Sequence, residues 1–100
     1  MIVIFRTRQL ERCYREYRKA VKAYGEDAAK RYVLRINTIK QARDIEELMK
    51  LPVLRCHPLK GNLAGQYAVN ITGFYRLIFS LEGEMLEIAR IEEVSKHYGD

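Results

Sequence analysis

The fold is decided by the stretch Gln66-Tyr67-Ala68-Val69-Asn70-Ile71, followed by Thr72-Gly73 and the run Tyr75–Leu81. Tyr67, Val69 and Ile71 occupy every second position, so they share one face of an extended strand. Gln66, Ala68 and Asn70 occupy the opposite face. A glycine-bearing turn between two such runs predicts an antiparallel β-hairpin.

The same pattern of short apolar runs and turns continues on both sides of this hairpin. Glu82-Gly83 is a turn before Met85–Ile91, a run that again alternates between two faces. Upstream, Val53–His57 is strand-like, and Lys60–Gly65 is a loop with two glycines. Turns at such regular intervals predict an antiparallel meander of three or four strands.

The first half of the chain has helical rather than alternating periodicity. Met1–Phe5 is a short β-branched strand. Between an N-cap at Thr7 and a stop at Gly25, apolar residues recur at spacings of three and four, namely Leu10, Cys13, Tyr14, Tyr17, Val21 and Tyr24. A second helix starts near Glu26–Asp27, with the apolar face Ala29, Tyr32, Val33, Ile36 and Ile39. The short connection predicts an antiparallel helix hairpin.

A third, short helical turn is predicted from a capping box. Asp44 stands at the cap position with Glu47 three residues later, and Pro52 ends the segment after Met49. The order of elements is therefore β, α, α and then three or four β. This order predicts an α+β fold in which a two-helix N-terminal hairpin packs on one face of an antiparallel sheet.

Length and composition restrict the class of protein. One hundred residues predict a single domain, 1–100. No window of about 18 apolar residues is present, and Met1–Phe5 is too short for the apolar part of a signal peptide. We therefore expect a cytoplasmic protein with no membrane partner. Cys13 and Cys56 lack metal-site spacing, so we expect them to be reduced and buried.

Positive charge is concentrated in the first 40 residues. They hold 11 Lys and Arg against 4 Asp and Glu, whereas residues 41–100 hold 7 against 9, and the whole chain is +5. A basic surface favours polyanions or an acidic partner. On the first helix the side opposite the apolar face carries Arg8, Arg12, Arg15, Lys19 and Lys22. Such a row either binds nucleic acid or is an ordinary solvated helix face.

The usual cofactor and metal motifs are missing from the sequence. Residues 61–65 lack the Lys and Ser or Thr of a P-loop, and no zinc spacing is present. We therefore expect neither a cofactor nor a metal. The polar candidates are His57, Lys60, Arg76, Arg90, Lys96, His97 and Tyr98. Arg76 lies within an apolar strand, where an idle charge is costly, so it either pairs with a carboxylate such as Glu87 or binds an anion.

These residue types suit metal-free RNA cleavage. That reaction needs a base for the ribose 2′-OH, a cation for the crowded phosphorane and an acid for the leaving 5′-oxygen. An arginine fork matches phosphate oxygens, and Lys, Tyr and His can move protons once their pKa values are tuned.

Three motifs carry a resemblance to a known family. They are His57-Pro58-Leu59-Lys60-Gly61, Gly65-Gln66-Tyr67-Ala68-Val69-Asn70-Ile71 and Tyr75-Arg76-Leu77-Ile78-Phe79, with a His-Tyr pair near the end. Together they resemble the HigB-type toxins, or plasmid maintenance killer proteins, of the RelE/ParE superfamily. Length and element order resemble that superfamily over essentially the whole chain.

The resemblance implies a toxin of a type II toxin–antitoxin system that cuts mRNA on the ribosome by attack of the 2′-OH on the adjacent phosphate. It implies that Arg76 and Lys60 stabilise phosphate charge and that Tyr98 orients or deprotonates the nucleophile. It implies a histidine, His57 or His97, as the acid, and the basic first helix as a surface for ribosomal RNA. Its implied partners are the ribosome with mRNA and a HigA-like helix-turn-helix antitoxin whose complex with the toxin binds operator DNA.

The sequence departs from the family pattern at two places. The family commonly ends in Asp-Tyr-His, whereas this chain reads Lys96-His97-Tyr98-Gly99, and Tyr67 replaces a common Trp. Two other functions on the same fold therefore remain open. One is a ParE-like DNA gyrase inhibitor, and the other is a catalytically inactive binding module.

Overall fold

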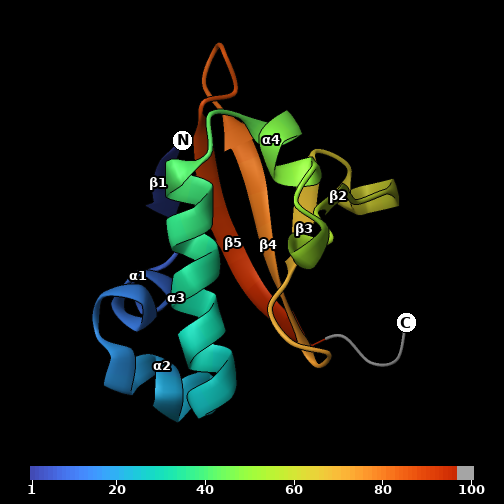
Figure 1. Ribbon diagram of the computed structural model, residues 1–100. Helices are drawn as coiled ribbons and strands as arrows, with labels where there is room; N and C mark the ends of the chain where they lie inside the picture. Colours follow the sequence, from blue (N-terminus) through green and yellow to red (C-terminus); the bar gives the residue numbers. More distant parts are fainter. Residues whose placement is uncertain (97–100) are drawn as a thin grey trace.

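The computed structural model describes residues 1–96, which fold as helices packed on a five-stranded sheet (Figure 1). The elements in chain order are β1 (Ile2–Phe5), α1 (Arg8–Arg15), α2 (Tyr17–Tyr24), α3 (Glu26–Gln41), α4 (Ile45–Met49), the 3-10 turn η1 (Pro52–Leu54), β2 (His57–Pro58), the 3-10 turn η2 (Gly61–Leu63), β3 (Gln66–Asn70), β4 (Tyr75–Glu82) and β5 (Ile88–Lys96).

The sheet has the strand order β1-β5-β4-β3-β2. The predicted α+β fold is confirmed, and β2 to β5 form the expected antiparallel meander. β1 instead pairs in parallel with β5, with Ile2 opposite Ile88 and Phe5 opposite Ile91. The sheet is therefore mixed rather than purely antiparallel. All elements from α1 to β4 lie between these two strands in the chain, so the connection is long enough for the crossover that a parallel pair requires.

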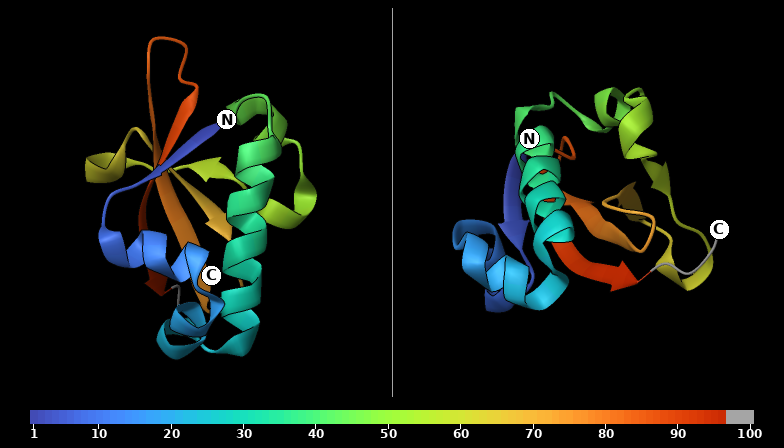
Figure 2. Two further views of the ribbon diagram at one scale, coloured as in Figure 1. Left: turned by 90° about the vertical axis from the view of Figure 1, so that its left-hand side faces the viewer. Right: turned by 60° about the horizontal axis from the view of Figure 1, so that its bottom comes forward.

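The core lies between α3 and one face of the sheet. From α3, Tyr32, Ile36 and Ile39 are fully buried, and they meet an apolar layer that includes Leu77, Phe79 and Ile91 of the strands. Figure 2 shows α1, α2 and α3 gathered beside the sheet. The buried Tyr32 hydroxyl donates a 2.6 Å hydrogen bond to the Leu10 carbonyl of α1, so its polar end is satisfied.

The predicted long first helix is wrong in one respect, because it is two helices. Glu16 is extended, with φ −123° and ψ 98°, and separates α1 from α2. The bend turns α2 onto α3, so Ala20 is fully buried while the predicted core residue Tyr17 is 45% exposed. A small residue at this contact lets the two helices approach closely.

The predicted strand Val53–His57 is also wrong for most of its length. Pro52–Leu54 is a 3-10 turn, and only His57–Pro58 pairs with β3. Proline has a fixed φ and no N–H to donate, which suits the first turn of a helix rather than a strand. The turn buries Leu54 and leaves Val53 64% exposed.

The last predicted strand begins later and runs further than expected. β5 begins at Ile88 instead of Met85 and continues to Lys96. Met85 and Leu86 belong to the β4–β5 hairpin loop and are 84% and 51% exposed. The alternation holds within the strand itself, since Ala89 and Ile91 are buried.

The predicted cap at Asp44 is confirmed, whereas Glu47 bonds the residue before the cap and not the cap residue itself. The Asp44 carboxylate accepts a 3.0 Å hydrogen bond from the Glu47 N–H, and the Glu47 carboxylate accepts one of 3.0 Å from the Arg43 N–H. These bonds satisfy backbone donors that would otherwise lack partners at a helix N-terminus. In the described part of the chain, no helix is long and apolar enough to cross a membrane.

The buried cysteines give a test of the core. Cys13 and Cys56 are free and buried, and burial raises the pKa of both thiols, that of Cys56 to about 11. Only about one Cys56 thiol in a thousand is then ionised at pH 8, and the thiolate is the reactive form. We predict that iodoacetamide leaves both cysteines unmodified in the native protein and alkylates both in denaturant, as measured by mass spectrometry. Rapid native alkylation of Cys13 would contradict this packing.

Candidate functional site

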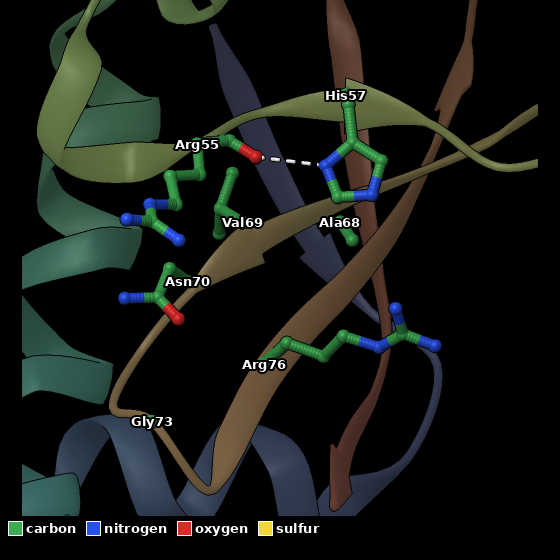
Figure 3. Close-up of a pocket in the computed structure, with 7 residues that line it drawn as sticks. All are labelled: Arg55, His57, Ala68, Val69, Asn70, Gly73 and Arg76. Carbon is green, nitrogen blue, oxygen red and sulfur yellow. Dashed lines mark hydrogen bonds between the residues drawn. The ribbon is translucent and has the colours of Figure 1, made fainter. Parts of the chain in front are cut away.

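A cavity of about 530 Å³ lies at the edge of the sheet formed by β2 and β3 and the start of β4 (Figure 3). The residues that line it are Arg55, His57, Ala68, Val69, Asn70, Gly73 and Arg76. Ala68 and Asn70 alternate with core residues of β3, and His57 and Arg76 are their partners across the strands. These four side chains therefore share the sheet face that points away from the core.

Arg76 is held half-buried in β4, opposite Asn70 on β3 and Ser95 on β5. Its Nε atom is fully buried and has no hydrogen-bond partner among residues 1–96. The predicted alternative of a pair with Glu87 is wrong, because Glu87 precedes β5 at the far end of the sheet and its carboxylate accepts from the Met85 N–H. A guanidinium whose Nε is buried without a partner, and which lines a cavity, is suited to an anionic ligand.

His57 has its tautomer set by the backbone. Its Nδ1 lies 2.8 Å from the Arg55 carbonyl oxygen, as Figure 3 shows. A carbonyl oxygen can only accept, so Nδ1 carries the proton in this hydrogen bond. The Nε2 atom of the neutral ring is then a proton acceptor, and it becomes a donor only when the imidazole is protonated.

The other side of the cavity is formed by Arg55 and Asn70, whose side chains lie together in Figure 3. Asn70 is half-buried, and its backbone carbonyl oxygen accepts a 2.7 Å hydrogen bond from Nε of Arg35 on α3. Arg35 is only 8% exposed, and burial is the main cause that lowers the pKa of its guanidinium, followed by the charge of Arg31. Arg35 thus anchors the end of β3 from the side of the sheet that α3 covers.

The cavity is strongly cationic. Arg55 and Arg76 line it together with His57, and no carboxylate is among the lining residues that the structure describes. An anion there meets forked N–H donors from the half-buried Arg76 and from the exposed Arg55. In residues 1–96 no group of three metal-binding side chains occurs.

The structure brings together two of the five residues predicted to be catalytic, His57 and Arg76. Lys60 is exposed at the cap of η2 and does not line the cavity. His97 and Tyr98 lie outside the described residues. Sequence reasoning missed Arg55 and Asn70, although Asn70 stands on the polar face of the alternating strand and would have been found by asking what opposes Arg76.

The predicted RNA-binding row lies on two helices and away from the cavity. Its members are all exposed and comprise Arg8, Arg12, Arg15, Lys19 and Lys22. Arg15 forms an ion pair with Glu11 one turn earlier at 3.0 Å. The bend at Glu16 divides the row, so α1 and α2 present two adjoining basic surfaces.

Comparison with known proteins identifies the class and then the family. The fold is that of RelE-like toxins, and the family model described as "RelE-like toxin of type II toxin-antitoxin system HigB" matches residues 3–91. The protein therefore belongs to the HigB-like toxin family. The matched segment contains every residue that lines the cavity. Among the curated proteins, none matches the sequence significantly.

Several solved structures share the fold at low sequence identity. The YoeB/ParE toxin from Agrobacterium tumefaciens is 18% identical, with a TM-score of 0.63 over 98% of this chain and 100% of that one. The YoeB–YefM complex from Staphylococcus aureus is 19% identical in sequence, with a TM-score of 0.64 over 98% of each chain. YafQ from E. coli strain BL21(DE3) is 18% identical, with a TM-score of 0.62 over 97% of each chain.

The tautomer of His57 can be tested directly. We predict that, in the neutral ring, Nδ1 is protonated and Nε2 is not, because the Arg55 carbonyl accepts from Nδ1. A long-range ¹H–¹⁵N correlation spectrum at alkaline pH distinguishes the two nitrogens. The chain has two histidines, so His57→Asn assigns the signals. A proton on Nε2 of the neutral ring would contradict the prediction.

Proposed function

We propose that this protein is the toxin of a type II toxin–antitoxin pair and acts in the cytoplasm as a ribosome-dependent, metal-independent mRNA endoribonuclease. Membership of the HigB-like family supports the toxin assignment. The observation that supports the ribonuclease assignment is the buried Nε of Arg76, which has no partner among residues 1–96. It shares with His57 a cavity that no carboxylate of these residues lines. RNA supplies the anion that this guanidinium lacks within residues 1–96.

In the proposed reaction the ribose 2′-oxygen attacks the adjacent phosphorus while the bond from phosphorus to the 5′-oxygen breaks. The products are a 2′,3′-cyclic phosphate and a 5′-hydroxyl. Arg76 stabilises the negative charge that accumulates on the phosphorane oxygens. The protonated His57 ring can donate a proton from Nε2 to the leaving 5′-oxygen, and the 2′-OH proton passes to a separate base on the opposite side of the phosphorus.

The remaining predicted residues enter as proposals that rest on the resemblance. Lys60 approaches the RNA from the loop beside the cavity as a second cation. Tyr98 orients or deprotonates the nucleophile, and His97 is the alternative acid to His57. These two assignments concern residues outside the described part of the chain.

The proposed partners are the ribosome, mRNA and a HigA-like helix-turn-helix antitoxin whose complex binds operator DNA. A net charge of +5 supports an acidic antitoxin surface. The solved YoeB–YefM complex shows one related fold bound to another protein. The gene beside the toxin gene is the candidate source of this partner.

Arg76 provides the first test of the proposed function. We expect Arg76→Ala to lower mRNA cleavage by about 10²–10³-fold, the usual cost of removing one transition-state donor. Primer extension on mRNA from a translating extract measures the cleavage, and growth after induction measures toxicity. The buried Nε of Arg76 has no hydrogen-bond partner within residues 1–96, so the variant is expected to fold normally.

Lys50→Ala is the matched control, since it removes an exposed positive charge outside the cavity. Full activity of Arg76→Ala would contradict the site. A wild-type protein that cuts no mRNA but blocks gyrase in a supercoiling assay would establish the ParE-like alternative instead. A folded protein inactive in both assays would be the binding module.

The basic row on α1 and α2 gives a second, independent test. We expect the triple variant Arg8→Glu, Arg12→Glu, Lys19→Glu to bind ribosomes more weakly and with less dependence on salt, because each lost phosphate contact lowers the salt slope by about 0.7–0.9. Sedimentation at several salt concentrations measures both. A triple Lys40, Arg43, Lys50→Glu variant matches the charge change elsewhere. Equal effects of the two variants would show that the row is an ordinary solvated face.

A further inference from the structure

Arg55 has an unusual backbone conformation beside the cavity. Its φ of 47° and ψ of 41° place it in the left-handed region, which residues other than glycine rarely adopt. Arg55 is exposed, its side chain lines the cavity, and it forms no ion pair within residues 1–96. Non-glycine residues in this region concentrate at ligand-binding sites.

This conformation links Arg55 to the residues already placed in the site. The Arg55 carbonyl accepts from His57 Nδ1 at 2.8 Å, while the Arg55 side chain reaches the Asn70 side of the cavity (Figure 3). One residue therefore orients the imidazole with its backbone and supplies a cation with its side chain. The guanidinium of Arg76 lies at the other side of the same cavity.

The Arg55 side of the cavity is positive, and the strand end beneath it is anchored. Arg35 is buried and holds the Asn70 carbonyl at 2.7 Å, so the end of β3 is fixed under this part of the cavity. No carboxylate lines the cavity within residues 1–96 to neutralise Arg55. Successive phosphates of one RNA strand carry one negative charge each, and a guanidinium fork matches their oxygens.

We propose that Arg55 binds the phosphate next to the scissile one, so that the cavity holds two successive phosphates of a single RNA strand. Arg76 then contacts the scissile phosphate and Arg55 its neighbour. This inference rests on the proposed function, because that function makes the Arg76 side the reaction centre. Arg55 is a binding residue in this scheme, and its removal weakens substrate binding rather than the chemical step.

The test uses a 2′-O-methyl trinucleotide, which has two charged linkages and cannot be cleaved. Two further trinucleotides each carry one uncharged methylphosphonate linkage. NMR titration of the purified protein measures their dissociation constants. We expect each neutral linkage to weaken binding to the wild type about tenfold, the usual cost of one charge-assisted hydrogen-bonding contact.

Arg55→Gly is the decisive variant, because glycine accepts the left-handed conformation and keeps the backbone in place. We expect it to bind the fully charged trinucleotide about tenfold more weakly. It should lose nothing further when the linkage that faces Arg55 is the neutral one, and this trinucleotide also gives the direction of the strand. An unchanged His57 Nδ1–H signal shows that the backbone contact persists. Arg55→Lys should recover part of the affinity, since it keeps the charge but loses the fork.

Lys50→Ala is the control and should change each constant less than about twofold, the size expected for an exposed charge outside the site. Equal loss on all three trinucleotides in Arg55→Gly would overturn the inference, as would no loss, or no saturable binding by the wild type. These outcomes are separate from the proposed function. That function fails if the wild type cuts no mRNA in a translating extract, whatever Arg55 binds.

Discussion

The register of β3 against β4 is the constraint on which both the core and the site depend. Tyr67 pairs with Phe79 in the layer under the helices, and their rings stack with centroids 5.7 Å apart. Because side chains alternate with a period of two, the same register sets Asn70 opposite Arg76 on the other face. A slip of one residue would bury the Arg76 guanidinium in the core and expose Phe79. The packing energy of the core therefore also holds the cavity in shape.

Further along β4, the charged side chains on the same face of the sheet have partners of opposite charge. The cavity differs from that region in this respect. The Ser80 hydroxyl donates to Glu92 at 2.6 Å, and Arg90 lies 3.5 Å from Glu92 and 3.8 Å from Glu82. No such partner among residues 1–96 reaches Arg76, four residues before Ser80. A buried N–H that lacks a hydrogen-bond partner is costly to the folded protein. In the proposed function, RNA supplies the missing partner.

Much of the fold follows from local sequence pattern. The alternation in residues 66–71 predicts β3 and the residues that share each of its faces, and the Asp44 capping box predicts α4. The errors occur where local preference competes with packing. The helical periodicity runs unbroken through Glu16, yet the chain bends there so that Ala20 can pack against α3. No local pattern specifies that contact, because α3 follows later in the chain and its position is set by the sheet.

The sequence by itself determined that Arg76 sits within an apolar strand, and it placed His57 at the end of a predicted strand, which made both candidates for the site. Only the tertiary structure decided that they share a cavity with Arg55 and Asn70. Arg55 enters that cavity through a left-handed turn, and Asn70 is fixed by the buried Arg35, 35 residues earlier. Periodicity shows which side of its own element a residue occupies, whereas a binding site depends on which elements pack beside one another. That packing is determined by burial and by strand pairing between residues far apart in the chain.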